Sequence, residues 1–517
     1  MHPLLLLFLA MFWMGSASAQ APDIAWQRCY GGSLTESGRG LVRTDDGGYV
    51  LVGFAGSDDG DVTFNHGDHD VWVVKVAVDG AIQWEETFGG SEQDQAHDIQ
   101  QTADGGYIIA GFTYSDDGDV TGYHGQEDAW VLKISATGVL EWQNALGGSE
   151  MDWASSIQQT TDGGYVVGGC SHSVDGDCTD TNGELDFWIV RLDASGVLIW
   201  QHSYGGAGAD YGLSVQQTTD GGFVMAGSVD TDSNNGDVVG HHGLSDGWVI
   251  KLDPSGLLQW QRPLGGSSGD AMSDVRQTTD GGYAVFGSSG STDGDATFTQ
   301  GQSDFWLVKL DASGTLIWQT SAGGSYSDYG DGMRLTLDGG YIACGRSYSS
   351  NDGDHPVNHG GYDEWVVKFD ASGVLQWQRS LGGTQDEGIY SSVREVNADS
   401  ILVISTSMSN DVDVSGNHGW TDLWVVQLSS SGMAVAEGEP EHFSLAPNPA
   451  HQEAIVSTST FMMNTTIVLM DVTGRIVSSS PVNEHEHRLD LGTVPPGPYV
   501  VHLFSDAGTL AQRLIVQ

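Results

Sequence analysis

The chain is poor in positive charge. Its 517 residues include 18 lysines and arginines against 69 aspartates and glutamates, which gives a formal net charge of -51. Such a surface repels nucleic acids and anionic membranes and attracts divalent cations or cationic partners. We therefore expect no nucleic-acid partner. The acidity fits equally well a secreted or salt-adapted protein that its charge keeps soluble.

Long apolar segments are also lacking. The one marked apolar run, residues 4–14, is too short to span a bilayer. Residues 17–19 follow it with the small-x-small pattern of a signal peptidase site, so residues 1–19 are predicted to be a signal peptide that is cleaved between Ala19 and Gln20. No other stretch could cross a membrane, and we expect an exported protein without a transmembrane segment.

Cysteine is scarce, with four residues in the whole chain. Cys170 and Cys178 lie eight residues apart in one loop, and the oxidising environment of an exported protein favours a disulfide between them. Cys29 and Cys344 stand where the other repeats carry mostly small or apolar residues, so we expect them to be buried free thiols.

What the chain has in abundance is a repeat. One Trp opens a Trp-Val-Val-Lys-like run and another opens a Trp-Gln-like run, each seven times and at intervals of 58 to 60 residues. Such a period indicates a repeat architecture. The 74 glycines suit many tight turns between short strands, so the fold class is all-β. The two sets are Trp72, Trp130, Trp188, Trp248, Trp306, Trp365 and Trp424, and Trp26, Trp84, Trp142, Trp200, Trp260, Trp318 and Trp377.

Each repeat contains four short β-rich runs, as at residues 154–160, 165–169, 187–192 and 197–201. Tight turns join the first run to the second and the third to the fourth, which leaves two long connections. Consecutive apolar residues mean that each sheet is covered on both faces. We predict a seven-bladed β-propeller of four-stranded blades over residues 20–432, closed by the N-terminal strand. Its long loops share one face, which is the functional candidate.

The first long loop of each repeat carries an Asp-Gly-Asp-like group. Oxygen ligands around a glycine turn suit calcium, the one cofactor that the sequence suggests. Asp and Gly are also the commonest turn residues, so the sequence leaves both interpretations open. The candidate calcium ligands are Asp59, Asp61, Asp117, Asp119, Asp175, Asp177, Asp293, Asp295, Asp352 and Asp354.

Two further polar patterns recur. His-Gly-x-x-Asp-x-Trp holds an Asp two residues before the buried Trp, and we expect this Asp to lock a turn by accepting backbone N–H groups, with no zinc role for the His. Gly-Gly-Ser-x-x-Asp supplies a second acid in the other long loop. The basic residue of each Trp-Val-Val-Lys-like run is expected to pair with a nearby turn acid, such as Asp193 or Asp253.

The sequence offers no catalytic residue. A catalytic centre needs unlike groups that converge once, whereas nearly every polar residue here is repeated around the ring. No Gly-x-Ser-x-Gly nucleophile elbow is recognised, since the pattern occurs only within the repeated loops at residues 243–247 and 265–269. His-Glu-x-x-His and nucleotide-loop motifs are missing, and the arginines look sparse and scattered, with Arg346 breaking the repeat pattern near the long-loop face. Loop aromatics could stack on sugars or cap the core; they are Tyr114, Tyr123, Trp153, Tyr211, Tyr329, Tyr348 and Trp420.

After Gly432 the period stops. Residues 433–440 are predicted to be a linker and residues 441–517 a small Ig-like β-sandwich. Pro-Asn-Pro, Asp-x-x-Gly-Arg and Gly-x-Tyr occur there in this order, with Pro447, Asn448, Pro449, Gly474, Arg475, Gly497 and Tyr499. The combination resembles the C-terminal (type A) sorting domain of the type IX secretion system of Bacteroidota. The resemblance implies passage through the outer membrane by that machinery, removal of the tail, and release or attachment at the cell surface.

The repeat region resembles the Asp-Gly-Gly-Tyr and Trp-Val-Val-Lys repeat propellers of the same bacteria, whose activity is unassigned and some of which are labelled endoglucanase by similarity alone. We expect a secreted or surface-displayed monomer that binds a glycan or protein ligand through its long-loop face. A hydrolase acting on polysaccharide and a purely structural surface protein are the alternatives.

Overall fold

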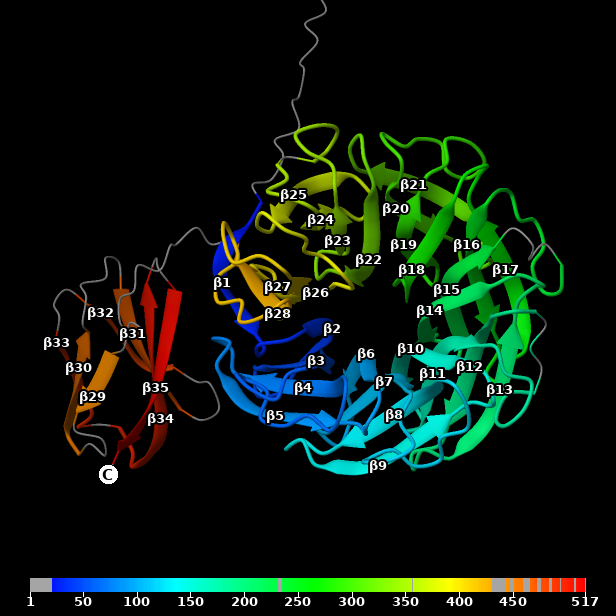
Figure 1. The fold of residues 1–517 in the computed structure, drawn as a ribbon. Coiled ribbons are helices and arrows are strands. Elements are labelled where there is room, and N and C mark those ends of the chain that lie inside the picture. Colours follow the sequence, from blue (N-terminus) through cyan, green and yellow to red (C-terminus); the bar gives the residue numbers. More distant parts are fainter. Residues whose placement is uncertain are drawn as a thin grey trace, which may run out of the picture. The chain divides into compact units, whose positions relative to one another are not determined.

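The computed structural model describes residues 21–429, except 180, 182, 231–234 and 356, and residues 443–516, except 447–450, 459–464, 472–475, 483–485, 493 and 506–507. The chain divides into two compact units, Met1–Gly432 and Met433–Gln517 (Figure 1). The predicted signal peptide with its cleavage site at Ala19 and Gln20, the predicted linker 433–440, and the motif residues Pro447, Asn448, Pro449, Gly474 and Arg475 lie outside the described residues.

The first unit is a ring of seven four-stranded antiparallel sheets, as predicted (Figure 1). The first strand of each blade lies innermost. Blades 1 and 2 are β2 (Glu36–Arg43), β3 (Tyr49–Ala55), β4 (Asp70–Val76), β5 (Ile82–Phe88), and β6 (Asp94–Gln101), β7 (Tyr107–Thr113), β8 (Asp128–Ile134), β9 (Leu140–Leu146). Blades 3 and 4 are β10 (Asp152–Gln159), β11 (Tyr165–Ser171), β12 (Asp186–Leu192), β13 (Leu198–Tyr204), and β14 (Asp210–Gln217), β15 (Phe223–Asp230), β16 (Ser245–Leu252), β17 (Leu258–Leu264).

The remaining blades continue the same order. Blades 5 and 6 are β18 (Asp270–Gln277), β19 (Tyr283–Ser289), β20 (Asp304–Leu310), β21 (Leu316–Ala322), and β22 (Asp328–Leu335), β23 (Tyr341–Ser347), β24 (Asp363–Phe369), β25 (Leu375–Leu381). Blade 7 combines β26 (Ser392–Asn397), β27 (Ser400–Ser407) and β28 (Asp422–Ser429) with the N-terminal β1 (Asp23–Tyr30). Over the described ranges every regular element is a strand. No helix found there is long and apolar enough to cross a membrane.

The two Trp motifs act together in each blade. The Trp of the third strand is fully buried, because both faces of its sheet are covered by neighbouring blades. Its indole N–H still needs a partner, and the Gln that follows the Trp of the fourth strand accepts it, as in Trp188 to Gln201 Oε1 at 2.9 Å. In blade 1 Glu85 replaces this Gln and accepts the Trp72 N–H at 2.9 Å. The repeat therefore encodes both the buried Trp and the acceptor for its indole N–H.

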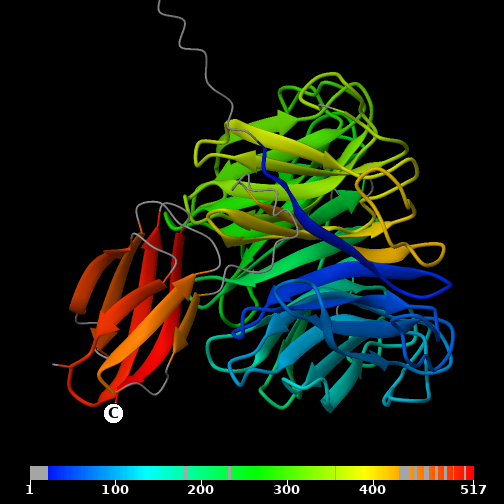
Figure 2. The same cartoon turned by 90° about the vertical axis from the view of Figure 1, so that its left-hand side faces the viewer.

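The N-terminal strand closes the ring, as predicted. β1 pairs antiparallel with β28 along its length, and the blue N-terminal strand lies beside the strands of blade 7 in both views (Figure 1, Figure 2). Gln27 Oε1 accepts the Trp424 indole N–H at 2.8 Å, so a bond that lies within one stretch of chain in other blades here joins the two ends of the propeller. The edge of the last sheet is thereby covered.

Six third strands carry a basic residue, and it pairs with a different acid from the one expected. The buried Lys75 contacts Asp46 at 2.7 Å and Lys309 contacts Asp280 at 3.0 Å, and both acids belong to the Thr-Asp-Gly-Gly turn. Asp193 instead binds backbone N–H groups within its own turn. The expected pairing with Asp193 or Asp253 is wrong because a side chain on the third strand reaches across to the hairpin turn that joins the first strand to the second.

The second unit consists of two small sheets. They order as β29-β30-β33 and β32-β31-β34-β35, and their apolar residues form one core. Gly497 opens β34, and the Tyr499 hydroxyl donates to the Pro495 carbonyl at 2.8 Å. The elements are β29 (Phe443–Ala446), β30 (Glu453–Thr458), β31 (Thr465–Asp471), β32 (Ile476–Val482), β33 (Glu486–Asp490), β34 (Gly497–Ser505) and β35 (Gly508–Val516).

Candidate functional site

Each Asp-Gly-Asp loop is hydrogen-bonded to the long loop that leads into the first strand of the same blade. Asp59 Oδ1 accepts the Ser33 N–H at 2.7 Å, the Asp61 N–H donates to Gly31 O at 2.9 Å, and Gly31 N–H approaches Asp61 Oδ2 at 3.3 Å. The same clamp recurs at Asp117 and Asp119, Asp175 and Asp177, and, through the first acid and the loop backbone, at Asp293 with Asp295 and Asp352 with Asp354.

These carboxylates thus have a structural role in the fold. Over the residues that the structure describes, no group of three or more His, Cys, Asp or Glu side chains is placed to hold a metal ion. The Asp-Gly-Asp turn still offers oxygen ligands, so calcium binding at these loops stays a prediction.

The expected disulfide is not formed. Cys170 and Cys178 are both buried free thiols. Cys170 faces blade 4, where its Sγ lies 3.1 Å from the Gly212 nitrogen, whereas Cys178 packs in the core between blades 2 and 3. Cys170 faces blade 4 and Cys178 faces blade 2, so the two side chains lie on opposite sides of the blade 3 sheet and cannot pair. Cys29 and Cys344 are buried and free, as expected.

The acid of His-Gly-x-x-Asp-x-Trp locks its turn, as predicted. Asp70 is fully buried in β4, and its Oδ2 accepts both the backbone N–H and the ring Nδ1 of His66 at 2.6 Å. The acid of Gly-Gly-Ser-x-x-Asp does the same for its own loop, since Asp94 Oδ2 accepts the Gly90 N–H at 2.8 Å. In the last copy this acid is Glu387, which accepts the Gly383 N–H at 2.8 Å.

The two acids meet at the junction of adjacent blades. A Cβ on Gly89 would lie 2.6 Å from Asp70 Oδ1 and 2.6 Å from Asp94 Oδ2, so both oxygens face the same small space, and Asp70 Oδ1 has no hydrogen-bond partner. Burial raises the pKa of Asp94 to about 6. It also raises the pKa of Asp304, the residue of blade 5 that corresponds to Asp70, to about 7. The other pairs are Asp422 with Glu36, Asp128 with Asp152, Asp186 with Asp210, Asp246 with Asp270, Asp304 with Asp328, and Asp363 with Glu387.

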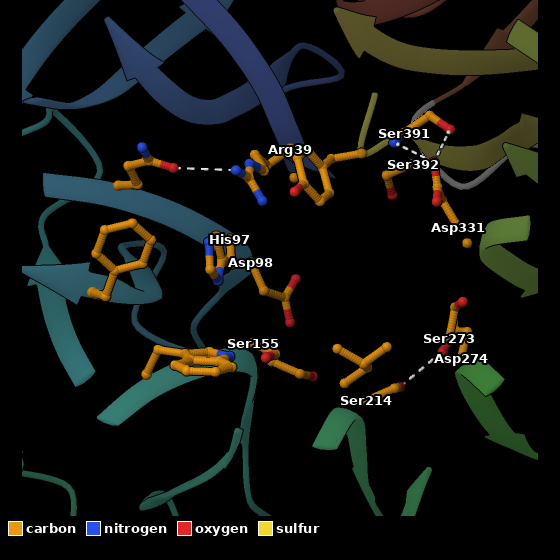
Figure 3. A pocket seen from close by; sticks show the side chains of 18 of the residues that line it. Arg39, His97, Asp98, Ser155, Ser214, Ser273, Asp274, Asp331, Ser391 and Ser392 are labelled. Carbon is orange, nitrogen blue, oxygen red and sulfur yellow. Dashed lines mark hydrogen bonds between the residues drawn. The ribbon is translucent and has the colours of Figure 1, made fainter. Parts of the chain in front are cut away.

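The repeated acids stand apart from a cavity of about 580 Å³ in the centre of the ring, lined by the innermost strands (Figure 3). In β2, β6, β10, β14, β18 and β22 the pairing with the second strand slips by one residue, and this β-bulge leaves one residue without a cross-strand partner. Bulges of this kind aim a side chain away from the ladder. The bulge residues are Arg39, His97, Ser155, Leu213, Ser273 and Asp331. Three of them, Arg39, His97 and Asp331, carry ionisable groups.

These unlike groups converge once, which the repeat pattern alone had seemed to exclude. Arg39 stacks over the Tyr390 ring at 3.6 Å and donates to Gln95 Oε1 at 3.1 Å. Burial and the Arg39 charge lower the pKa of His97 to about 3, so its imidazole is neutral, with Nδ1 donating to the Ala154 carbonyl at 3.0 Å. Burial raises the pKa of Asp331 to about 6.

The arginines are not scattered. Arg276 and Arg334 line the cavity and both contact Asp274, at 2.9 and 2.8 Å. Burial and the charges of these two arginines lower the pKa of Arg394 to about 10. All three stand at one register position of consecutive innermost strands, where blades 2 to 4 carry Gln100, Gln158 and Gln216. Comparison of the repeats position by position would have revealed this substitution.

Aromatic side chains gather at the long-loop end of the channel. Trp153, Tyr211 and Tyr329 each follow the buried acid of an innermost strand. Trp153 and Tyr211 lie 6.4 Å apart between ring centroids, and Tyr348 and Tyr362 lie 5.1 Å apart. Of the other predicted aromatics, Tyr114 donates to Glu127 at 2.9 Å, Tyr123 donates to a backbone carbonyl, and Trp420 stands alone, 78% exposed.

Arg346 belongs to this group. It is the cross-strand partner of Tyr329, and its guanidinium carbon lies 5.3 Å from the Tyr329 ring centroid and 5.5 Å from that of Tyr362. Arg346 therefore lies beside the exposed Tyr329 ring and the half-buried Tyr362 ring.

Among proteins of known structure, the chain is similar at 11% identity to PorZ, a bacterial surface component of the type IX secretion system of Porphyromonas gingivalis, with a TM-score of 0.37 over 96% of this chain and 61% of that one. A second similar structure is the extracellular domain of the hybrid two-component system BT4673 of B. thetaiotaomicron, at 10% identity and a TM-score of 0.30 over 93% and 68%. A puromycin hydrolase is similar at 12% identity and a TM-score of 0.40 over 85% and 62%.

The chain spans about three fifths of the length of PorZ. No curated protein matches the sequence. A family model does match the second unit: it is that of the secretion system C-terminal sorting domain, and it covers residues 444–517. These residues hold Gly497 and Tyr499, two of the positions on which the sequence resemblance was based. The protein is thus a β-propeller that carries a type IX secretion C-terminal sorting domain and is exported to the cell surface or secreted.

Proposed function

We propose that this exported propeller binds a glycan at the long-loop end of its central channel. The observation that carries the proposal is the collection of aromatic rings around a cavity of about 580 Å³, a volume typical of small-molecule sites. Sugar rings present apolar faces that stack on aromatic side chains, while their hydroxyls need polar partners. Tyr211, 40% exposed, lies 6.4 Å from the lining residue Trp153 between ring centroids, and Tyr329, 37% exposed, holds the same place in blade 6, while polar groups such as Gln95 and Ser155 line the channel.

A glycan array tests the proposal, read with the wild-type protein and with Tyr211→Ala, Tyr329→Ala and Trp420→Ala. The two tyrosine variants should each lose about fivefold in affinity, because one stacking contact contributes on the order of 1 kcal/mol. Trp420 is the matched control, since it is 78% exposed and, unlike Tyr211 and Tyr329, contacts no other aromatic ring in the described part of the chain. Equal binding by all four proteins, or binding by none, would refute a glycan site at the channel mouth.

A hydrolase remains the second candidate, favoured by one observation. Asp331 is a channel carboxylic acid whose pKa is raised to about 6 by burial, as suits a general acid. The same array glycans, incubated with the protein, should then release reducing ends, and Asp331→Asn should abolish the release. Binding without release would favour the binding module.

A further inference from the structure

We infer that the turn end of the central channel is an oxyanion site, in which Arg276, Arg334 and Arg394 hold the carboxylate or sulfate group of an acidic saccharide. This inference rests on the proposed glycan function and names the class of glycan. The first observation is the clustering of positive charge. Three of the chain's 18 basic residues gather at one register inside a protein of net charge -51.

The three guanidiniums have too few carboxylates. Arg276 and Arg334 share Asp274, and Arg334 also donates to the Met333 carbonyl at 2.8 Å. Arg394 has neither an ion pair nor a hydrogen bond to any residue that the structure describes. Asp98 is the next acid that these arginines face. Its two carboxylate oxygens accept the Ile99 and Ile157 N–H groups at 2.8 and 2.9 Å. Three positive charges therefore meet at most two negative ones.

Free donors remain in this group. Nε of Arg276 and Nε of Arg394 are buried and have no hydrogen-bond partner in the described part of the chain. Leaving such a donor unsatisfied costs about 1 to 3 kcal/mol, and more for a charged group. Guanidinium groups match the planar oxygens of a carboxylate and the oxygens of a sulfate or phosphate ester, so an oxyanion would satisfy donors and offset charge together.

The fold does not require arginine at this register. In blades 2 to 4 the same position is Gln100, Gln158 and Gln216, and each side-chain carbonyl accepts a backbone N–H of the next blade, as Gln158 does from Gln217 at 2.6 Å. The arginines of blades 5 to 7 give up this blade-to-blade bond. A residue that lowers the regularity of the scaffold and adds unpaired charge is explained by a ligand rather than by folding.

The distance along the channel suits one short acidic saccharide. The bulge register, where Arg39 stacks on Tyr390, and the arginine register lie three residues apart on the innermost strands, and at about 3.3 Å per residue this separates the two registers by about 10 Å. A sugar stacked near Tyr390 and Trp153 could then place an acidic group of the same or the next residue on Arg276 and Arg334.

The first experiment measures the anion site without any assumption about the glycan. Thermal unfolding of the full chain is followed while sodium chloride is replaced by sodium sulfate at constant ionic strength. Wild type should show a saturable rise in midpoint, and Arg276→Gln with Arg334→Gln should raise the half-saturating sulfate concentration at least tenfold. Glutamine is the residue that the fold itself uses at this register. Arg379→Gln, which removes one positive charge from the rim pair with Asp23, should respond like wild type.

A change of opposite sign sharpens the test. Asp274→Asn removes the carboxylate that competes for the arginines while keeping an oxygen for the Met333 N–H, which Asp274 accepts at 3.0 Å. Sulfate should bind this variant several-fold more tightly. A sulfate response that is the same in wild type, in the double arginine variant and in Asp274→Asn overturns the oxyanion site.

The second experiment identifies the source of the anion by calorimetry with three probes: a galacturonate trisaccharide, its methyl ester, and a sulfated disaccharide. The acidic probes should bind at least tenfold more tightly than the ester, and the double arginine variant should lose this preference. Binding of all three probes with equal affinity would overturn the acidic-saccharide inference and leave the proposed glycan function intact. A specific sulfate response without binding of any glycan on the array would instead refute the proposed function and assign the site to a free anion.

Discussion

Replacing Asp304 by Asn should stabilise the propeller at neutral pH. Asp304 is fully buried in β20, where its Oδ2 accepts the Gln300 N–H at 2.6 Å, while its Oδ1 has no partner and faces the same space as Oδ2 of Asp328. Asn keeps the oxygen that the Gln300 N–H needs. Its amide nitrogen replaces the unpartnered oxygen and can donate to Asp328, so the change removes a buried charge and adds a hydrogen bond.

The expected gain in the free energy of unfolding follows from the pKa of Asp304. Burial, and then the nearby charges of Asp328 and Asp354, raise the pKa of Asp304 from 3.8 to about 7. The folded state therefore holds its proton more tightly than the unfolded state. Stability contributed by the protonated acid is complete below pH 3.8 and falls as the pH rises through 7. At about 1.4 kcal/mol per pKa unit, the loss is on the order of 4 kcal/mol, an upper value because a buried site relaxes around a charge.

Urea unfolding followed by tryptophan fluorescence, at pH 4, 5, 6, 7 and 8 and constant ionic strength, measures this. Asp304→Asn should match wild type near pH 4 to within about 1 kcal/mol and exceed it by about 2 to 4 kcal/mol at pH 8. Asp45→Asn is the control, because Asp45 is an exposed turn residue and its loss reports only the general repulsion of an anionic surface. A stability difference that does not change with pH, or that equals the Asp45→Asn difference, would refute the assignment of a buried, proton-binding carboxyl.

Three further predictions follow from the fold and its loops. Deletion of residues 24–30 should cause aggregation or a much lower unfolding temperature, because it exposes the edge of β28; an unchanged melting curve would mean that the ring closes without β1. A protein ending at Gly432 should fold yet remain in the periplasm, while residues 441–517 should export a fused reporter, and surface delivery of the truncated protein would contradict the role of the tail. Millimolar calcium should raise the unfolding midpoint more than sodium chloride of equal ionic strength, and Asp59→Asn with Asp61→Asn should reduce that response; an identical response would leave these loops as turns.

The propeller could be predicted because its determinants are local and repeated seven times. Turn residues, strand length and the two Trp positions each recur at a fixed place, so one error in one copy is corrected by the others. The closing role of β1 followed from counting Trp26 without a complete repeat before it. Such evidence needs no knowledge of side-chain direction.

Side-chain direction is what the sequence could not supply. Cys170 and Cys178 are close along the chain but lie on opposite sides of a sheet, so their spacing favoured a disulfide that the fold forbids. The Lys75 partner was misassigned for the same reason, because Asp46 is reached across the sheet rather than along the strand. Neither error is visible without the register between neighbouring strands.

The ionisable residues of the channel were missed because the sequence analysis compared the features that all seven repeats share. Averaging the seven copies makes every polar residue look symmetric, and the residues that differ, such as Arg39, His97 and Asp331, look like noise. They differ at one register because the bulge leaves that residue without a ladder partner and turns its side chain into the channel.

The residue that is repeated in every blade and the residue that varies between blades therefore lie at different registers of the same innermost strand. At the buried acid, a replacement without a side-chain oxygen loses the backbone hydrogen bond to the glycine turn, as Asp94 would lose that to Gly90, and every blade has an acid there. Three residues further along, at the bulge, a replacement breaks no cross-strand pair, and six blades carry five kinds of side chain. A scaffold that fixes the first register and frees the second can change its ligand without changing its fold, since the free register is the one that faces the cavity.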